Sequence, residues 1–275
     1  MRLLGLSLSF FSLVFLLPVF TASAQDSKSK RKGEFYFSWG YNKEWYTTSN
    51  LQVDQPELGN QYTFNHITAH DHPGWDNNLM GQPISIPQYN YRLGYIFNRK
   101  KGLGIEINFD HTKYIFEDQN ARISGILNNK PVDTSVAFNA DNGFYYYLNN
   151  GANFLLINFI KRWEIYHAKT EKLKLDFLGK AGIGPVIPHV QNSFFGQANE
   201  PHFQFGGWNM GVEAALRITC FNYVYIEYAN KYDYARYSGL QIYKGTAKQS
   251  FGTYEMILSL GFSFPVGRKE ESVSH

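Results

Sequence analysis

The feature that most constrains this chain is an alternation of apolar and polar residues with a period of two. Successive side chains of a strand point to opposite faces, so the pattern predicts strands with one apolar and one polar face. The alternation is less regular in the segment Asn153–Tyr166, because Leu156 and Ile160 interrupt it. Eight segments carry the pattern: Glu34–Glu44, Pro87–Phe97, Leu103–Ile115, Asn153–Tyr166, Leu173–Ile183, Trp208–Ile218, Val224–Tyr228 and Thr253–Phe264.

The lengths of the connections favour a membrane barrel over a soluble β-sandwich or lipocalin-like barrel. Short turns on one side and long loops on the other are typical of outer-membrane barrels, whose apolar residues face lipid. The short connections are Arg99–Lys101, His167–Glu171 and Phe221–Asn222, and the longer ones are Tyr46–Ile86, Phe116–Ala152, Gln191–Pro201 and Tyr237–Lys248. We therefore predict an all-β fold, an eight-stranded antiparallel up-and-down transmembrane β-barrel with long extracellular loops.

The N-terminus has the pattern of a secretory signal peptide. Arg2 precedes an apolar run from Leu3 to Phe20, and Ala22-Ser23-Ala24 supplies small residues for cleavage before Gln25. We expect a signal peptide at 1–24, a flexible periplasmic lead-in at 25–33, a barrel at 34–264 and a periplasmic tail at 265–275. Phe264 resembles the terminal signal that the barrel-assembly machinery recognises, although eleven residues follow it. These features predict a location in the outer membrane.

Charged residues on the polar faces predict a lumen without an open pore. An eight-stranded barrel is just wide enough for side chains to fill it, and opposite charges enclosed there are expected to pair. We expect Glu227 to pair with Arg217 or Lys180 rather than to perform chemistry. The residues predicted to point inward are Arg92, Glu106, Asp110, Lys174, Asp176, Lys180, Glu213, Arg217, Glu227 and Glu255.

The first long loop contains a predicted hairpin and a histidine-rich segment. Leu51–Val53 and Tyr62–Thr68 flank Pro56–Gly59, which favours a hairpin rising above the membrane. In extended chain, imidazoles of one face could bind a divalent metal, whereas solvated or hydrogen-bonded histidines are the alternative. The candidate metal ligands are His66, His70 and His72.

Basic residues are also predicted near the outer membrane interface. His111 and Lys113 continue the apolar face of the third strand, and His189 ends that of the fifth. Such residues suit the phosphates of lipopolysaccharide, and side chains that extend to the interface are the alternative. We expect the outer-membrane lipid and lipopolysaccharide as partners.

Several short motifs resemble those of a known family. They are Ile86-Pro87-Gln88-Tyr89-Asn90-Tyr91-Arg92-Leu93-Gly94-Tyr95, Phe109-Asp110-His111-Thr112-Lys113-Tyr114, Gly182-Ile183-Gly184-Pro185 with Pro188-His189-Val190, and Glu227-Tyr228 with Tyr232. They are similar to eight-stranded outer-membrane barrels that include lipid A oxidases and OmpA-like proteins. The resemblance implies a site at the outer leaflet with catalytic positions Asp110, His111, Lys113, His189 and Glu227.

The net charge and the number of cysteines exclude or disfavour some classes of protein. A net charge of +3 argues against a nucleic-acid binder, and the single Cys220 excludes an internal disulfide. The first hypothesis is a non-enzymatic barrel whose surface loops serve binding or envelope integrity. The alternatives are a lipid A-modifying enzyme, either oxidase-like or a deacylase using Ser193 or Ser238 with a histidine, and a narrow solute channel. The cofactor and the oligomeric state are left open.

Overall fold

The computed structural model describes residues 31–74, 88–170 and 172–269. These residues form antiparallel strands and two single-turn 3₁₀ helices, η2 (Pro56–Leu58) and η4 (Ala140–Asn142). None of the described helices is long and apolar enough to cross a membrane. The predicted signal peptide at 1–24 lies outside the described residues.

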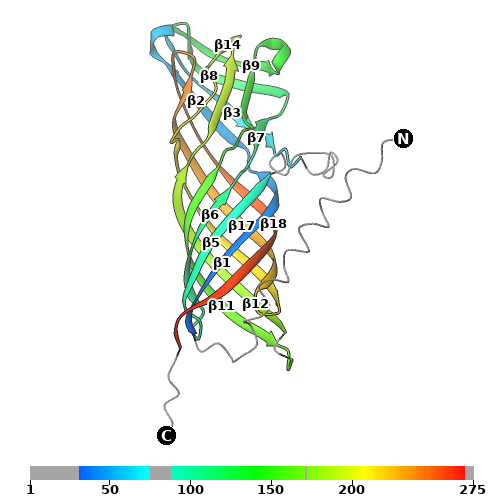
Figure 1. The fold of residues 1–275 in the computed structure, drawn as a ribbon. Helices are drawn as coiled ribbons and strands as arrows, with labels where there is room; N and C mark the ends of the chain where they lie inside the picture. Colours follow the sequence, from blue (N-terminus) through cyan, green and yellow to red (C-terminus); the bar gives the residue numbers. More distant parts are fainter. Residues whose placement is uncertain (1–30, 75–87, 171, 270–275) are drawn as a thin grey trace, which may run out of the picture.

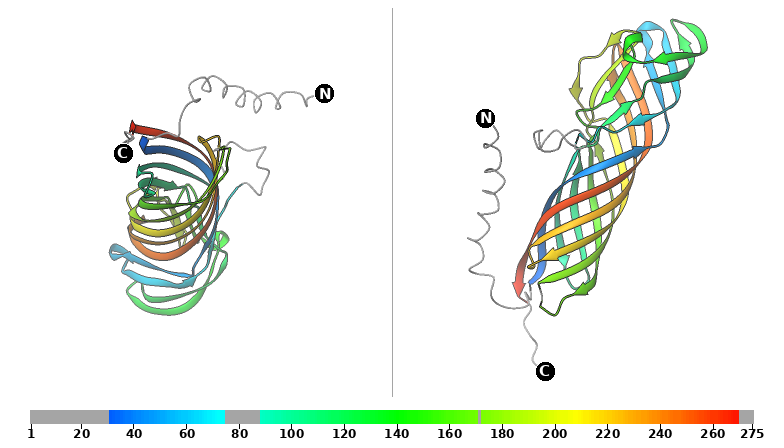
Figure 2. Two further views of the ribbon diagram at one scale, coloured as in Figure 1. Left: turned by 90° about the horizontal axis from the view of Figure 1, so that it is seen from below. Right: turned by 90° about the vertical axis from the view of Figure 1, so that its right-hand side faces the viewer.

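Eight strands pair in a closed ring, and Figures 1 and 2 show the barrel that they form. Each pairs with the next in antiparallel fashion, and the last pairs with the first over 15 partners, from Arg31 opposite Lys269 to Tyr46 opposite Thr253. Closure leaves the barrel without a free sheet edge, which confirms the predicted fold class. The strands are β1 (Arg31–Tyr46), β5 (Tyr89–Asn98), β6 (Leu103–Asp110), β11 (Phe154–His167), β12 (Leu173–Val186), β16 (Gly207–Cys220), β17 (Val224–Ile242) and β18 (Gly245–Lys269).

The outer surface of the barrel is apolar. Large hydrophobic side chains point outward with about half of their surface exposed, while charged neighbours in sequence are enclosed. This arrangement is the reverse of a soluble barrel and suits a hydrocarbon solvent. The apolar belt includes Leu93, Ile105, Ile107, Ile157, Phe159, Ile183, Val212, Leu216, Ile226, Leu258 and Leu260.

Beyond the belt, the polarity of the strands inverts. In the upper part of β17, Ala235 and Tyr237 are buried inside, whereas Arg236 between them is exposed. In β18, Ala247 is buried and Lys248 is exposed. Here the strands have an apolar inside and a polar outside, as soluble β-proteins do.

The long loops fold around these strand extensions into an ordered unit, which we call the extracellular body. Sheet pairing continues from β18 through β2, β3, β8 to β9, while β14, β13, β10, β7 and β4 form a second sheet, with β15 paired to β13. Its strands are β2 (Ser49–Gln55), β3 (Asn60–Ile67), β4 (Ala69–His70), β7 (Tyr114–Phe116), β8 (Gln119–Leu127), β9 (Lys130–Phe138), β10 (Tyr145–Leu148), β13 (His189–Phe194), β14 (Gln197–Ala198) and β15 (His202–Phe203).

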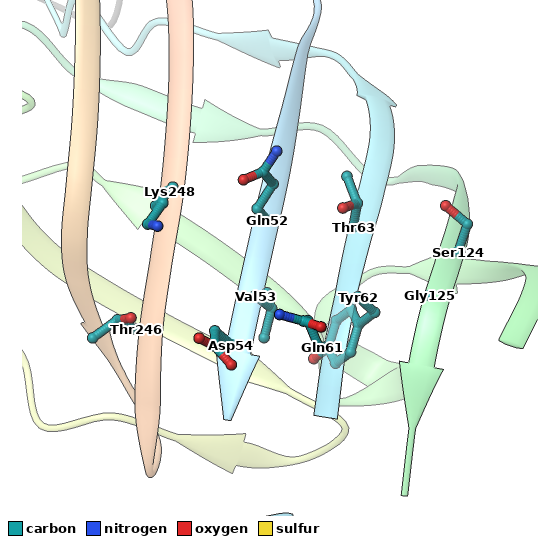
Figure 3. A pocket seen from close by; sticks show the side chains of 10 residues that line it. All are labelled: Gln52, Val53, Asp54, Gln61, Tyr62, Thr63, Ser124, Gly125, Thr246 and Lys248. Carbon is teal, nitrogen blue, oxygen red and sulfur yellow. The ribbon is translucent and has the colours of Figure 1, made fainter. Parts of the chain in front are cut away.

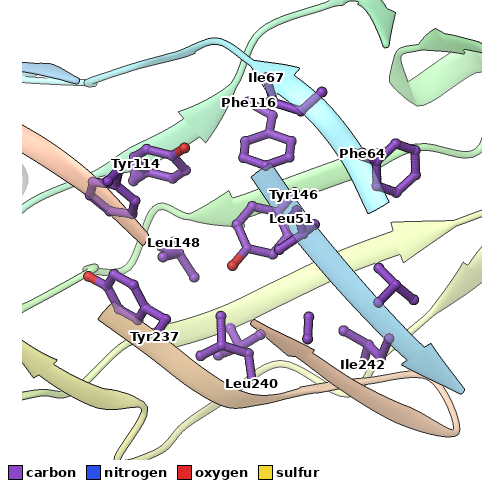
Figure 4. Close-up of a cluster of buried hydrophobic side chains, with 14 of the residues drawn as sticks. Leu51, Phe64, Ile67, Tyr114, Phe116, Tyr146, Leu148, Tyr237, Leu240 and Ile242 are labelled. Atoms are coloured by element: carbon purple, nitrogen blue, oxygen red, sulfur yellow. The ribbon is translucent and has the colours of Figure 1, made fainter. Parts of the chain in front are cut away.

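The extracellular body has its own hydrophobic core (Figure 4). Phe64 lies at its centre, with its ring 5.3–6.1 Å from those of Phe138, Phe194 and Phe144. Leu51, like Phe64, is fully buried. The core extends down into the top of the barrel, where it includes Phe154, Leu156, Val186 and Phe251.

Several strand boundaries differ from those predicted. The hairpin of the first loop is confirmed as β2 and β3. The third predicted strand is interrupted, because β6 ends at Asp110 and β7 begins at Tyr114. The fifth ends at Val186, so that His189 begins β13 of the extracellular body. The seventh strand continues to Ile242 and the last to Lys269, well beyond the ends predicted at Tyr228 and Phe264.

Leu156 and Ile160, which blurred the fourth predicted strand, both point inward. Leu156 belongs to the core at the top of the barrel, and Ile160 packs in a small apolar cluster that also contains Tyr36, Leu178 and Tyr225. The side chains of this strand therefore still alternate between the inner and the outer face of the barrel. The alternation looked irregular because apolar side chains occupy both faces of this strand.

We expect Phe64→Ala to destabilise the extracellular body by about 3–5 kcal/mol, because the substitution leaves a cavity among packed rings. Faster amide hydrogen exchange in β2, β3 and β8 would report the loss. Phe221→Ala, in the turn between β16 and β17 where Phe221 is exposed, is the control and should leave exchange unchanged. Equal exchange in the two variants would contradict a packed extracellular core.

Candidate functional site

The middle of the lumen holds a balanced cluster of three cations and three carboxylates. The ammonium of Lys180 lies 2.9–3.0 Å from the carboxylates of Glu106, Glu213 and Glu227. Arg92 contacts Glu213 at 2.7 Å and Glu106 at 3.2 Å, and the Nε of Arg217 donates to Glu227 at 2.6 Å. All six side chains are almost completely buried. The predicted pairing of Glu227 with Arg217 and Lys180 is confirmed.

Two tyrosines hold the guanidinium of Arg217 in place. The rings of Tyr36 and Tyr225 lie 4.4 and 4.0 Å from its central carbon, within the range of cation–π interactions. The hydroxyl of Tyr36 donates to Glu106 at 2.6 Å. The ring lies over Gly94, where a Cβ atom would come within 2.0 Å of it, so only glycine leaves room for this contact.

A second cluster lies higher in the lumen around Lys231. Its ammonium is 2.5 Å from Asp110, 2.5 Å from Asp233 and 3.3 Å from Glu255. One carboxylate oxygen from each of Asp110, Asp233 and Glu255 lies within 4.8 Å of the other two, close enough together to be considered as metal ligands. Lys231 contacts all three carboxylates and Arg92 lies 4.0 Å from Asp110, so ion pairs join this group.

Above this cluster the lumen contains packed rings of the hydrophobic core, of which Tyr114 and Tyr237 are seen in Figure 4. Tyr114 stacks on Phe251 with 4.1 Å between ring centroids, and its hydroxyl accepts a hydrogen bond from Gln249 at 2.8 Å. Tyr237 stacks on the same ring at 5.4 Å and donates to the carbonyl of Ala152. The lumen is therefore filled by paired charges below and packed rings above.

The structure places the five predicted catalytic residues on different sides of the barrel wall. Asp110 and Glu227 lie in the lumen within the two ion-pair clusters. His111 stacks on Tyr89 at 4.6 Å, and its Nδ1 lies 2.9 Å from Oδ1 of Asn153. His189 meets Phe203 edge-on at 4.7 Å. The two carboxylates therefore face the lumen, His111 lies on the outer face beside Tyr89, and His189 belongs to the extracellular body.

Lys113 was expected to point outward at the interface, and this expectation is wrong. The side chain is buried, with 7% of the residue exposed, because the chain leaves the barrel wall after Asp110 and turns into the extracellular body. Burial lowers the pKa of Lys113. Burial also lowers the pKa of His111, which favours its neutral form, and lowers that of His189, with His202 as a second cause.

The three histidines proposed as metal ligands are all exposed but do not form a group of ligand atoms such as the one around Lys231. His66 has a φ of 55°, so the chain there is not extended as the prediction assumed. The Nδ1 of His70 lies 2.7 Å from the carbonyl of Asp71. A metal at His66, His70 and His72 stays a prediction.

The serines considered for a deacylase have different surroundings. Ser193 is buried and donates to the carbonyl of Gly143 at 2.9 Å. Ser238 is exposed, and its backbone N–H donates to the carbonyl of Gly206. The described contacts pair neither hydroxyl with a histidine.

Sequence reasoning missed the outward polar residues of the strand extensions. Arg236 and Lys248 fell at or beyond the ends assigned to the seventh and eighth strands. The available signal was the alternation that continues through residues 229–237 and 247–254, in which the polarity of the two faces is exchanged from Ala235 to Tyr237 and from Ala247 to Phe251.

Comparison with known proteins gives no family assignment. No protein-family model matches the chain, and no curated protein matches its sequence. Similar solved structures include the outer membrane protein OprG from Pseudomonas aeruginosa (10% identity, 88% of this chain and 100% of that chain covered, TM-score 0.42) and the outer membrane protease OmpT from Escherichia coli (9%, 88% and 100%, 0.40). Ail, the attachment invasion locus protein of Yersinia pestis, is a third (16%, 85% and 99%, 0.32).

We expect Lys180→Met to reduce the free energy of unfolding by about 3–5 kcal/mol, because three buried carboxylates then share too few cations. Urea unfolding in lipid vesicles, followed by gel mobility, measures the change. Lys130→Met removes an exposed charge from β9 and should change stability by no more than about 0.5 kcal/mol. Equal unfolding midpoints would show that the network does not hold the lumen together.

The strand pairing and the apolar belt together define the molecule. The chain is an eight-stranded, up-and-down transmembrane β-barrel with a filled lumen and a folded extracellular body.

Proposed function

We propose that this chain is an integral outer-membrane protein that presents a rigid extracellular body for binding at the cell surface or for envelope integrity. The observation that carries the proposal is the hydrophobic core of that body, which is continuous with the top of the barrel. Such a core holds the loops in one arrangement, and a rigid scaffold positions surface residues with little loss of entropy on binding.

The outer membrane is the proposed location. Support comes from the closed barrel with its apolar belt and from the predicted signal peptide. Within hydrocarbon, a closed barrel and an α-helix are the structures that satisfy all backbone hydrogen bonds.

The filled lumen favours surface presentation over transport. A solute would have to break ion pairs at Lys180 and Lys231 and then displace the stacked rings of Tyr114, Phe251 and Tyr237. A narrow solute channel is therefore the weaker hypothesis.

The lipid A-modifying enzyme, oxidase-like or deacylase-like, is the alternative that the sequence suggested. Its proposed residues lie on both sides of the barrel wall. Asp110 and Glu227 are committed to ion pairs, and Asn153 binds His111. This distribution favours a non-enzymatic role.

Planar-bilayer recording tests the closed lumen. We expect no discrete conductance steps from the refolded protein, because paired charges and stacked rings occupy the lumen. A porin refolded in the same way is the positive control. Regular steps that disappear on denaturation would overturn the proposal and support the channel.

Mass spectrometry of lipid A tests the enzyme alternative. We expect the same lipid A species from cells that produce the protein and from cells that lack it. A mass shift of one oxygen, or of one acyl chain, that depends on the protein and is lost in His111→Gln would support enzymatic modification instead.

A further inference from the structure

One strip of outward side chains rises from the apolar belt to the upper part of the extracellular body. It crosses β17, β18, β2, β3 and β8, which are neighbours in one sheet. Strand register fixes a row across four of them, with Lys248 opposite Gln52, Gln52 opposite Thr63, and Thr63 opposite Ser124. Directly paired residues of antiparallel strands point to the same face, so these four side chains share the outer face.

Two cations mark the lower end of this strip. Arg236 lies opposite Trp208 in register, and the ring of Trp208 is 5.9 Å from that of Tyr234. Arg236 also lies opposite Ser250, which is two residues from Lys248 on β18, a separation of about 7 Å along the strand. Both cations are exposed, and neither forms an ion pair with a carboxylate among the described residues.

These cations stand where the surface changes from apolar to polar. Trp208 and Tyr234 have the position of an interfacial aromatic girdle, which sits at the level of lipid headgroups. On the side of β16, Phe203 and Phe205 are 59% and 78% exposed, and hydrogen bonds from the Gln204 side chain to Gly239 and from Gly206 to Val186 hold their segment. Exposed rings of this size suit acyl chains or the apolar faces of sugars.

Beyond Arg236 the surface is hollowed, and Lys248 is one of the residues that line the hollow (Figure 3). The hollow has a volume of about 300 Å³ and is open to solvent. In Figure 3 the side chains of four strands lie side by side along it. Its outward lining combines amides, hydroxyls, one carboxylate and one ammonium: Gln52, Asp54, Gln61, Thr63, Ser124, Thr246 and Lys248.

We propose that this strip binds one molecule of a phosphorylated glycolipid of the outer leaflet. Its acyl chains would lie on the apolar belt near Trp208, and its phosphates would contact Arg236 and Lys248. Its sugars would occupy the hollow, where amides and hydroxyls donate to and accept from sugar hydroxyl groups. The inference deepens the proposed function and rests on it, because it requires the extracellular body to face the outer leaflet.

The order of the side-chain types along the strip fits a glycolipid better than a protein. Apolar rings, then exposed cations, then a lining made mostly of amides and hydroxyls follow one another upward from the bilayer, as acyl chains, phosphates and sugars do in a glycolipid. The strip is also continuous with the belt that already contacts lipid. Asp54, the carboxylate in the hollow, lies beyond Lys248 next to Thr246, where it can accept hydrogen bonds from sugars.

Binding is tested with the full protein in neutral detergent micelles. The probes are lipid A with its phosphates, dephosphorylated lipid A and lipopolysaccharide that carries core sugars. Removal of the two cations in R236Q/K248Q should weaken binding of phosphorylated lipid A about tenfold or more, because charge-assisted hydrogen bonds are lost. Q52A/T63A should keep the affinity for lipid A and lose any additional affinity contributed by the core sugars.

The matched control is K100Q/K130Q, which removes the same net charge from exposed positions outside the strip. Gel mobility confirms that each variant is folded. Equal affinities of R236Q/K248Q and the control for phosphorylated lipid A, or equal binding of the phosphorylated and dephosphorylated forms by the unmodified protein, would overturn the inference. The bilayer recordings would be unaffected by that result, so a failure here is distinct from a failure of the proposed function.

Discussion

Pairing of β1 with β18 is the interaction on which the rest of the structure depends. Hydrocarbon offers no hydrogen-bonding partner to the backbone, so an open sheet in the bilayer would leave an edge of unsatisfied N–H and C=O groups. Fifteen paired positions close that edge. Closure then forces alternate side chains to face either lipid or a narrow lumen, and the paired charges around Lys180 and Lys231 follow from that enclosure.

The apolar and polar faces exchange sides along the continuous strands β17 and β18. The backbone of β17 and β18 runs unbroken from bilayer to solvent, and the outer face changes from Leu258 to Lys248 as the surrounding medium changes. In the lower half of these strands the apolar side chains face lipid, whereas in the upper half they face inward. The resulting core around Phe64 and Phe251 makes the loops rigid and closes the lumen.

Local patterns were sufficient for much of this structure. The pairing of Glu227 with Arg217 and Lys180 and the hairpin of β2 and β3 were both predicted correctly, since each depends on alternation or on a turn between neighbouring segments. The outward orientation of Lys113 was wrong, because the alternation gives no sign of where the chain leaves the wall. The lengths of β17 and β18 were underestimated because the exchange of polarity between the faces looked like the end of a strand.

By itself the sequence determined that the chain forms strands, how many cross the membrane and that charged side chains are enclosed in the lumen, since a period of two and a scarcity of helical signals are local properties. Only the tertiary structure decided that the long loops form a body with its own core. It also aligned Lys248, Gln52, Thr63 and Ser124 in one row. These outcomes depend on pairings between residues distant in the chain, whose register no local pattern specifies.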